Sequence, residues 1–307
     1  MTRDASPALP PHTRRSFLKL GAAAVAVAHG GRQATGAATG DDATADSSPA
    51  DSTSTGLAVG LQSYSLRHLP LDAALRALRL NLHATVVELC PQHLAGLDPA
   101  DVAATLRRHG VRPWSVGVVP FGTDADANRR TFETAKALGT RNLSCDPDPE
   151  ALADLDDLAA EQDVTVAVHP GGPGHRWGTP DRLEAALAGR STRVGLCADT
   201  GHLIRAGADP VAVLRRFAGR LHAVHLKDFR RSADGSAWED VVAGTANLDL
   251  AEVARFLATL PRRVPVFVEY EGPDALAWVR QSMDRVRSAE AVVARDSAGS
   301  PEFVSRA

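Results

Sequence analysis

The chain has 307 residues, of which 44% are hydrophobic and 23% charged, and this composition is sufficient for one large globular domain. Its 34 Lys and Arg against 37 Asp and Glu give a formal net charge of -3, and this lack of a basic surplus argues against a nucleic-acid partner. Cys90, Cys145 and Cys197 form no CxxC pair and are expected to pack as small buried hydrophobes.

The first 30 residues carry the pattern of an export signal. Arg14 and Arg15 stand just ahead of a weakly apolar run, residues 20–29, that is rich in Ala and Gly. This arrangement resembles a twin-arginine signal, and its apolar run is too short and too poor in large side chains for a stable membrane span. We therefore expect export to the periplasm or the cell exterior, with no membrane span after cleavage.

Two low-complexity segments bound the predicted domain. Residues 31–56 are mostly Ala, Gly, Asp, Ser and Thr, and residues 297–307 likewise offer little to bury. So few apolar groups cannot offset the entropy that is lost on ordering, which predicts a disordered linker and a flexible tail. The folded domain is expected to span residues 57–296.

Within this domain, short apolar or alternating runs recur, and each is followed by a stretch with helical periodicity. Four helical stretches begin near Asp98, Asp124, Asp209 and Asp249, whose carboxylates can cap the free amides of a first helical turn. The eight predicted strands span residues 58–65, 84–90, 113–119, 141–145, 164–169, 194–199, 221–227 and 266–270.

Strict alternation of strand and helix indicates parallel strands, and eight such units over about 235 residues are typical of a (β/α)8 TIM barrel. The alternative is a doubly wound open sheet, which usually carries a Gly-rich phosphate turn after its first strand. Residues 61–65, Leu-Gln-Ser-Tyr-Ser, contain no glycine. The predicted fold class is therefore α/β, a single-domain TIM barrel.

Five predicted strands end on side chains suited to metal binding or acid–base chemistry. The C-terminal ends of the strands of a TIM barrel meet at one rim, where catalytic groups gather. Two imidazoles and two carboxylates converging there form a site for a divalent ion such as Mn, Mg, Co, Zn or Fe. We predict such an ion at His169, Asp199, His225 and Glu269, and we expect Glu88 on the opposite wall as a substrate contact, a second base or a rim salt bridge.

Side-chain alternation extends the predicted site. Glu271 shares a face with Glu269, and Lys227 shares a face with His225. Glu271 and Lys227 are therefore predicted substrate contacts, although a structural pair between Lys227 and Asp228 is an equal alternative for the lysine.

The loop after the fifth predicted strand is rich in Gly and Pro and carries Arg176 and Trp177. Such a loop lies near the mouth of a barrel, where Arg176 could contact substrate and the Trp177 ring could stack on a sugar. Decoration of a surface loop is the alternative for both residues.

Two motifs near the last three strands resemble those of a known family. Residues 198–202 read Ala-Asp-Thr-Gly-His, residues 224–228 read Val-His-Leu-Lys-Asp, and residues 267–269 read Phe-Val-Glu. In this order they resemble the strand-end motifs of the sugar phosphate isomerase/epimerase family, which has a xylose-isomerase-like TIM barrel. The resemblance covers essentially the whole predicted barrel.

The resemblance implies that Asp199, His225 and Glu269 bind a divalent metal and that His202 and Lys227 reach substrate oxygens. It also implies a fourth ligand at the end of the fifth strand, where the family usually has Glu and this chain has His169. A second departure is Ala246, at a position where the family usually has glycine.

The same family resemblance implies the chemistry. A metal-dependent sugar isomerase or epimerase removes a proton next to a carbonyl and forms an enediolate. Members that epimerise use two metal-bound Glu residues on opposite faces of the substrate, whereas this chain keeps only Glu269 of that pair. An imidazole ligand is a poor base because its lone pair is committed to the metal. We therefore expect one-base isomerisation or, alternatively, a lyase or dehydratase reaction on a keto sugar or glycoside.

Two other classes of protein are alternatives to a sugar isomerase or epimerase. A phosphodiesterase or nuclease on a related barrel would need further His and Glu ligands on the first four strands, which supply almost none. A noncatalytic sugar-binding barrel would bind a carbohydrate without turnover. Export favours an unphosphorylated carbohydrate as the small-molecule partner, and the sequence predicts neither the particular sugar nor the oligomeric state.

Overall fold

The computed structural model describes residues 57–299, including side chains up to residue 296. The predicted export signal (1–30) and linker (31–56) lie outside the described residues. Of the predicted flexible tail (297–307), residues 297–299 end the C-terminal helix, and the others lie outside the described residues. Within the described part of the chain, no helix has both the length and the apolar character needed to cross a membrane.

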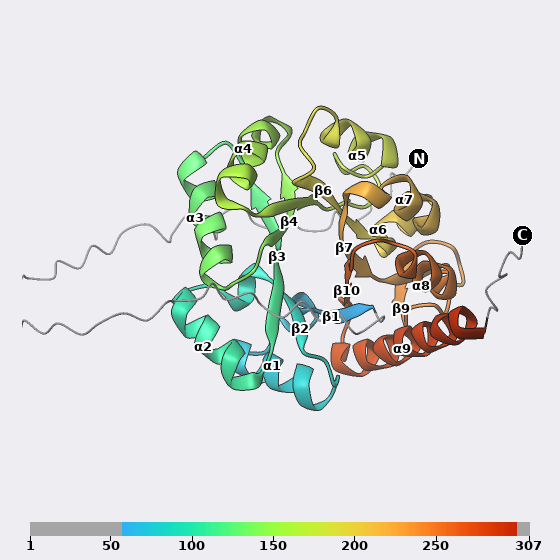
Figure 1. The fold of residues 1–307 in the computed structure, drawn as a ribbon. Coiled ribbons are helices and arrows are strands. Elements are labelled where there is room, and N and C mark those ends of the chain that lie inside the picture. The colour runs from blue at the N-terminus through green and yellow to red at the C-terminus, as the bar shows by residue number, and fades with distance from the viewer. Residues whose placement is uncertain (1–56, 300–307) are drawn as a thin grey trace, which may run out of the picture. The chain divides into compact units, whose positions relative to one another are not determined.

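Eight parallel strands form a closed barrel, and helices surround it on the outside (Figure 1). The predicted TIM barrel is thereby confirmed. Going round the barrel, the strand order is β1-β10-β7-β6-β5-β4-β3-β2. The strands are β1 (Ala58–Gln62), β2 (Val86–Leu89), β3 (Arg112–Phe121), β4 (Asn142–Pro147), β5 (Thr165–Val168), β6 (Val194–Asp199), β7 (Leu221–Leu226) and β10 (Pro265–Val268).

Each helix covers the barrel with one apolar face. In α1, Leu71, Ala74, Leu75 and Leu78 are buried, and their spacing of three and four residues places them on one side of the helix. The α-helices are α1 (Leu71–Leu80), α2 (Pro99–His109), α3 (Ala125–Ala137), α4 (Leu152–Gln162), α5 (Pro180–Leu187), α6 (Thr200–Arg205), α7 (Pro210–Arg216), α8 (Leu250–Ala258) and α9 (Ala275–Gly299). Short 3-10 helices are η2 (Ser63–Leu66), η3 (Pro91–His93), η4 (Pro149–Ala151) and η5 (Ala218–Arg220).

The four predicted aspartate caps are confirmed. Asp98 accepts a hydrogen bond from the amide of Ala100 at 2.7 Å, and Asp124, Asp209 and Asp249 cap α3, α7 and α8 in the same way. Each carboxylate satisfies an amide that has no partner within its helix, so these positions fix where the helices begin.

A small apolar cluster fills the inside of the barrel. Its members come from β2, β5, β6, β7 and β10, and residues from strands this far apart round the barrel can touch only across its interior. The larger core lies between the outer face of the strands and the helices. The inner cluster consists of Val86, Ala167, Cys197, Ala223 and Phe267.

One feature of the fold is absent from the sequence prediction. After β7 the chain forms an antiparallel hairpin of β8 (Asp228–Arg231) and β9 (Trp238–Val241) before it enters α8. Most of the residues between Arg230 and Asp240 are exposed, and the segment lacks the alternating apolar pattern from which a half-buried strand is recognised.

Gly195 on β6 tests how closely the strands must approach each other. A Cβ atom at this position would overlap the carbonyl oxygen of Arg220 in the neighbouring chain segment, and backbone cannot move aside as a side chain can. We expect Gly195→Ala to lower the free energy of unfolding by about 1–3 kcal/mol. Urea denaturation measures this, with Gly219→Ala as control because a Cβ there would meet nothing within 4 Å. Equal stability of the two variants would contradict the prediction.

Candidate metal centre and active site

The inner apolar cluster is followed, towards the C-terminal ends of the strands, by a layer of polar side chains. Each polar residue follows an inner-cluster residue by two positions along the same strand or just past its end. Side chains two positions apart in a strand point to the same face, so both point into the barrel. This parity is why the sequence prediction of a common rim holds. The polar layer consists of Glu88, His169, Asp199, His225 and Glu269, all of which are buried.

Four atoms of this layer lie at distances that suit one shared ion. His169 Nε2 lies 3.2 Å from His225 Nδ1 and 3.4 Å from Asp199 Oδ2, and Glu269 Oε2 lies 3.4 Å from His225 Nδ1. Ligand atoms about 2.0–2.2 Å from a tetrahedral ion lie about 3.3–3.6 Å from each other. The predicted ligands are therefore brought together at a spacing that fits a divalent metal.

The charge of the layer also fits a divalent ion. Glu88, Asp199 and Glu269 are buried carboxylates, and Lys227 is the buried ammonium that lies among them. Excess negative charge of this kind is costly away from water unless it is neutralised. Burial would lower the pKa of His225, but Cys197, Glu88 and Glu269 raise it well above its usual value, so the surroundings of this ring favour positive charge. In addition, no described residue donates a hydrogen bond to the buried Oδ2 of Asp199. The buried His/Asp/Glu cluster indicates a divalent metal site.

Lys227 links the metal centre to the mouth of the barrel. Its Nζ lies 3.2 Å from Glu269 Oε2 and 3.5 Å from Asp199 Oδ2, and it forms an ion pair with Glu271. Burial would lower the pKa of Lys227, but Asp199, Glu269 and Glu271 raise it well above its usual value. The side chain is therefore a fixed ammonium beside the site.

The alternative of a Lys227–Asp228 pair is wrong, because Asp228 is engaged elsewhere. Its carboxylate accepts four backbone hydrogen bonds, at 2.8–3.1 Å, from the amides of residues 245–248. Asp228 therefore holds the segment that contains Ala246, the position at which the family usually has glycine. The amide of Ala246 takes part in this contact at 2.8 Å, so the alanine is accommodated.

His202 lies beside the metal ligands but has a different role. Its ring is 5.3 Å from that of His169, and one of its nitrogens lies close enough to His169 and Asp199 to be counted as a potential ligand. Arg205 Nη2 lies 2.7 Å from Nδ1, and a guanidinium can only donate, so Nδ1 presents its lone pair and Nε2 carries the proton. Burial lowers the pKa of His202 to about 3, so the ring is neutral. His202 is thus a hydrogen-bond donor, as a substrate contact requires.

Glu88 lies beneath His225 and is completely buried. Its Oε1 accepts hydrogen bonds from His225 Nε2 at 2.7 Å and from Gln62 Nε2 at 2.6 Å, and its Oε2 accepts one from Ser144 Oγ at 2.7 Å. Burial would raise the pKa of Glu88, but His225 and the hydroxyl groups beside it lower it. The alternative of a rim salt bridge does not match these contacts, because Glu88 pairs with His225 inside the barrel. The catalytic and substrate roles expected of Glu88 stay predictions.

The loop after β5 is fixed to β4. Arg176 forms ion pairs with Asp146 and Asp148 at 3.0 and 2.8 Å, and Trp177 is 6% exposed and donates from its indole nitrogen to the carbonyl of Pro147. These contacts leave little of the Trp177 ring free for a sugar. The substrate contacts of Arg176 and Trp177 stay predictions, whereas their contacts with β4 show how the loop is held in place.

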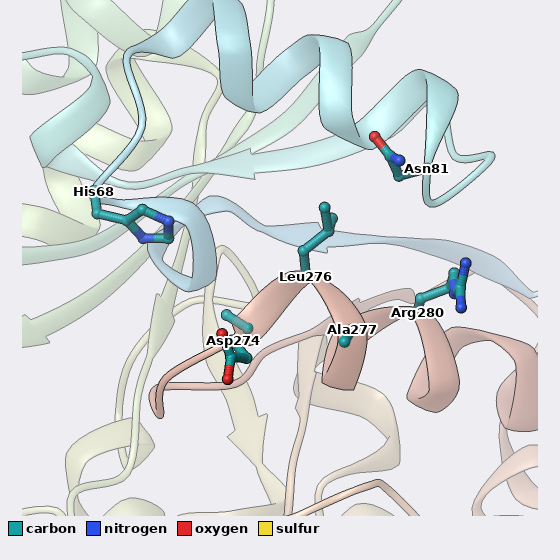
Figure 2. Close-up of a pocket in the computed structure, with 7 residues that line it drawn as sticks. His68, Asn81, Asp274, Leu276, Ala277 and Arg280 are labelled. Carbon is teal, nitrogen blue, oxygen red and sulfur yellow. The ribbon is translucent and has the colours of Figure 1, made fainter.

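A separate pocket lies outside the barrel, between the end of α1 and the start of α9 (Figure 2). None of the metal-site residues lines it, and its walls come from helix ends instead of strand ends. The buried His/Asp/Glu cluster therefore lies apart from this pocket, in the barrel interior. The pocket is lined by His68, Asn81, Asp274, Ala275, Leu276, Ala277 and Arg280.

Comparison with known proteins agrees with this fold. The family described as "Xylose isomerase-like TIM barrel" matches residues 82–289, which is more than half of the chain. The chain belongs to the xylose isomerase-like TIM barrel family. The sequence is 36% identical over 86 residues to inosose dehydratase of Clostridium tetani (strain Massachusetts / E88), a match that covers 26% of this chain and 27% of the relative. The chain thus spans only about a quarter of that relative's length.

Solved structures show the same barrel. L-ribulose 3-epimerase has a TM-score of 0.65 at 16% identity, with 81% of this chain and all of that chain covered. IOLI protein, whose crystal structure holds a zinc atom, has a TM-score of 0.60 at 18% identity, with coverage of 78% and 98%. At this identity the likeness concerns the fold alone. The family includes sugar epimerases and isomerases, and relatives of this chain include dehydratases.

Asp240 is a residue of this xylose isomerase-like barrel that sequence reasoning missed. The β8–β9 hairpin brings its Oδ2 to 3.1 Å from the amide of Glu271, while no described residue donates to its buried Oδ1. Burial raises the pKa of Asp240 to about 7, and the nearby carboxylates of Glu271 and Glu269 add to this shift. No motif marks the residue, because it enters the site through a hairpin that the sequence pattern did not predict.

Asp240 should make stability depend on pH. Between pH ~4, the usual value for Asp, and pH ~7 the folded protein keeps a proton that the unfolded chain has lost, so stability falls as pH rises through this interval. Relative to Asp240→Asn, the metal-free wild type should lose about 3 kcal/mol between pH 4.5 and 7.5. Thermal unfolding at both pH values measures this. The exposed neighbour variant Glu239→Gln should follow the wild type, and a pH-independent difference for Asp240→Asn would contradict the assignment.

Proposed function

We propose that this protein is a metal-dependent enzyme that isomerises a carbohydrate by removing a proton from the carbon next to a carbonyl group. The observation that carries this proposal is the convergence of His169, Asp199, His225 and Glu269 at 3.2–3.4 Å, with Lys227 in contact with two of them. Family membership supports the reaction class, because the family includes sugar isomerases and epimerases.

A divalent ion bound there would polarise a carbonyl oxygen and stabilise the negative charge that develops on an enediolate. The chain's own residues supply the other parts of the reaction. Burial would raise the pKa of Glu269, but Lys227 and His225 lower it to about 2, so the carboxylate is ionised, as the proposed proton acceptor must be. Lys227 can donate to a substrate oxygen, and His202 can orient another through Nε2.

The residues point to one base at this metal centre. Two-sided epimerisation needs an acid–base group on each face of the substrate, and among the four proposed ligands only Glu269 and Asp199 are carboxylates. Asp199 uses Oδ1 to accept the amide of His202 at 2.7 Å, which fixes it as a structural ligand. His169 would have its lone pair committed to the metal. Isomerisation, in which a single base moves one proton between neighbouring carbons, therefore fits better than epimerisation.

Elimination of water is the second candidate, and the match to an inosose dehydratase favours it. This reaction shares its first step, transfer of a proton from carbon to Glu269. The bond between the next carbon and its hydroxyl oxygen then breaks, the electron pair of the former C–H bond forms a C=C bond, and a proton from the Lys227 ammonium converts the departing hydroxide to water. No oxidant or reductant is needed.

Export by the twin-arginine route, proposed from the sequence, bears on the substrate. Phosphorylated sugars are scarce outside the cytoplasm, so an unphosphorylated sugar, keto sugar or glycoside is the proposed substrate class. We propose zinc, manganese, cobalt, iron or magnesium as the ion, since a mixed set of imidazoles and carboxylates suits each of them.

Removal of single ligands tests the metal centre. We expect His169→Ala and Glu269→Gln each to weaken divalent metal binding by about tenfold or more, because each takes away one of four donors. Metal content after dialysis and chelator competition measure this. Glu271→Gln is the matched control, since Glu271 contacts Lys227 but is not a ligand. Unchanged metal binding in both ligand variants would overturn the metal site.

Solvent deuterium tests the reaction class. With metal-loaded protein and a panel of aldoses, ketoses and keto sugars in deuterium oxide, we expect deuterium to enter the carbon next to the carbonyl of the true substrate. An isomerised product supports the first candidate, whereas an unsaturated product with loss of water supports dehydration. Tight binding of a sugar with no exchange and no product would instead identify a noncatalytic sugar-binding barrel and overturn both candidates.

A further inference from the structure

We propose that Glu88 is a positioning residue, which holds His225 in the tautomer that leaves Nδ1 free for the metal ion. Glu88 lies 2.7 Å from Nε2 of His225, and both side chains are completely buried. The inference rests on the metal site of the proposed function but not on the reaction, and it replaces the expected role of Glu88 at the substrate.

The two nitrogens of His225 face different partners. Nε2 faces the Glu88 carboxylate, whereas Nδ1 lies 3.2 Å from His169 Nε2 and 3.4 Å from Glu269 Oε2, among the other potential ligand atoms. A neutral imidazole carries a proton on one nitrogen and a lone pair on the other. A proton held on Nε2 by Glu88 therefore leaves the lone pair on Nδ1, on the side where the ion is proposed to bind.

The neighbours of Glu88 require it to accept hydrogen bonds. The amide oxygen of Gln62 accepts from the backbone of Tyr64 at 3.0 Å, so its Nε2 is the end that faces Glu88 and donates to it at 2.6 Å. Ser144 donates to the second carboxylate oxygen at 2.7 Å. With His225, three donors converge on one carboxylate, so both of its oxygens act as acceptors.

Substrate has no access to this carboxylate. Gln62 also donates to the carbonyl of Gly117 at 3.0 Å, which closes the space between β1 and β3. At Gly117 a Cβ atom would stand 2.9 Å from Glu88 Oε1 and 2.6 Å from the Cβ of Ser144, so the surrounding strands leave no room even for a methyl group. Glu88 therefore acts on the substrate only through His225.

A carboxylate on the far nitrogen makes a histidine ligand more basic and fixes the orientation of its ring, and loss of such a partner costs about 10–100-fold in metal affinity. The Glu88→Gln variant separates the two effects. Its amide oxygen can accept from Gln62 and His225, and its amino group can donate to the hydroxyl oxygen of Ser144. The hydrogen bond to His225 is then kept while the negative charge is lost.

Chelator competition with Zn²⁺ tests the proposal by affinity. We expect Glu88→Ala to weaken Zn²⁺ binding by about 10–100-fold and Glu88→Gln by a smaller factor. The control is Glu161→Gln, a surface carboxylate paired with Arg129, which should bind as the wild type does. Circular dichroism checks that each variant is folded. Wild-type affinity within twofold in a folded Glu88→Gln and a folded Glu88→Ala would overturn the proposal.

Nitrogen-15 NMR of histidine-labelled protein tests the tautomer directly and does not need the Ala variant to fold. In the Zn²⁺-loaded wild type, the His225 ring should show a proton on Nε2 and a metal-shifted Nδ1; coordination through Nε2 would overturn the proposal. If the wild type binds no divalent ion, the metal site of the proposed function fails. If Zn²⁺ binds through Nδ1 but no sugar reacts, the proposed reaction fails while the role of Glu88 stands.

Discussion

Mutual repulsion among buried carboxylates is the constraint around which the centre of this barrel is organised. Glu88, Asp199 and Glu269 lie inside the barrel, and the single ammonium of Lys227 cannot neutralise all three. Charges removed from water must be paired or must bind a metal, because desolvation is expensive. A divalent ion among the four proposed ligand atoms would balance the charge, and the two histidines would serve as donors without adding to the negative charge.

The surrounding structure serves to hold these groups in place. Gln62 and Ser144 on β1 and β4 fix Glu88, Arg205 fixes the ring of His202, and Asp228 fixes the segment before α8. In each of these contacts a donor meets an acceptor, which offsets the cost of removing both from water. The ligands thus come from rigid strands while their orientation is set by residues on neighbouring elements, an arrangement that suits a preorganised metal centre.

The departures from the family pattern lie close to the reacting groups. His169 replaces a carboxylate that would repel Asp199, and it lies 3.4 Å from Asp199 Oδ2. The exchange reduces the negative charge of the centre and removes one potential base. The β8–β9 hairpin brings another carboxyl group, Asp240, to the backbone of Glu271 next to the ion pair with Lys227. Acid–base groups in this chain are therefore arranged differently from those of a site with two metal-bound glutamates.

The sequence by itself determined the eight strands, the four aspartate caps and the inward row of ligands, because strand periodicity and helix capping are local properties of the chain. It also indicated His169, Asp199, His225 and Glu269 as a set, since strand ends of a barrel meet at one rim. Only the tertiary structure decided that Glu88 contacts His225, 137 residues away in sequence, and that Asp228 binds backbone amides instead of Lys227. Such pairings depend on which residues face each other in the closed barrel, and local sequence patterns do not predict this.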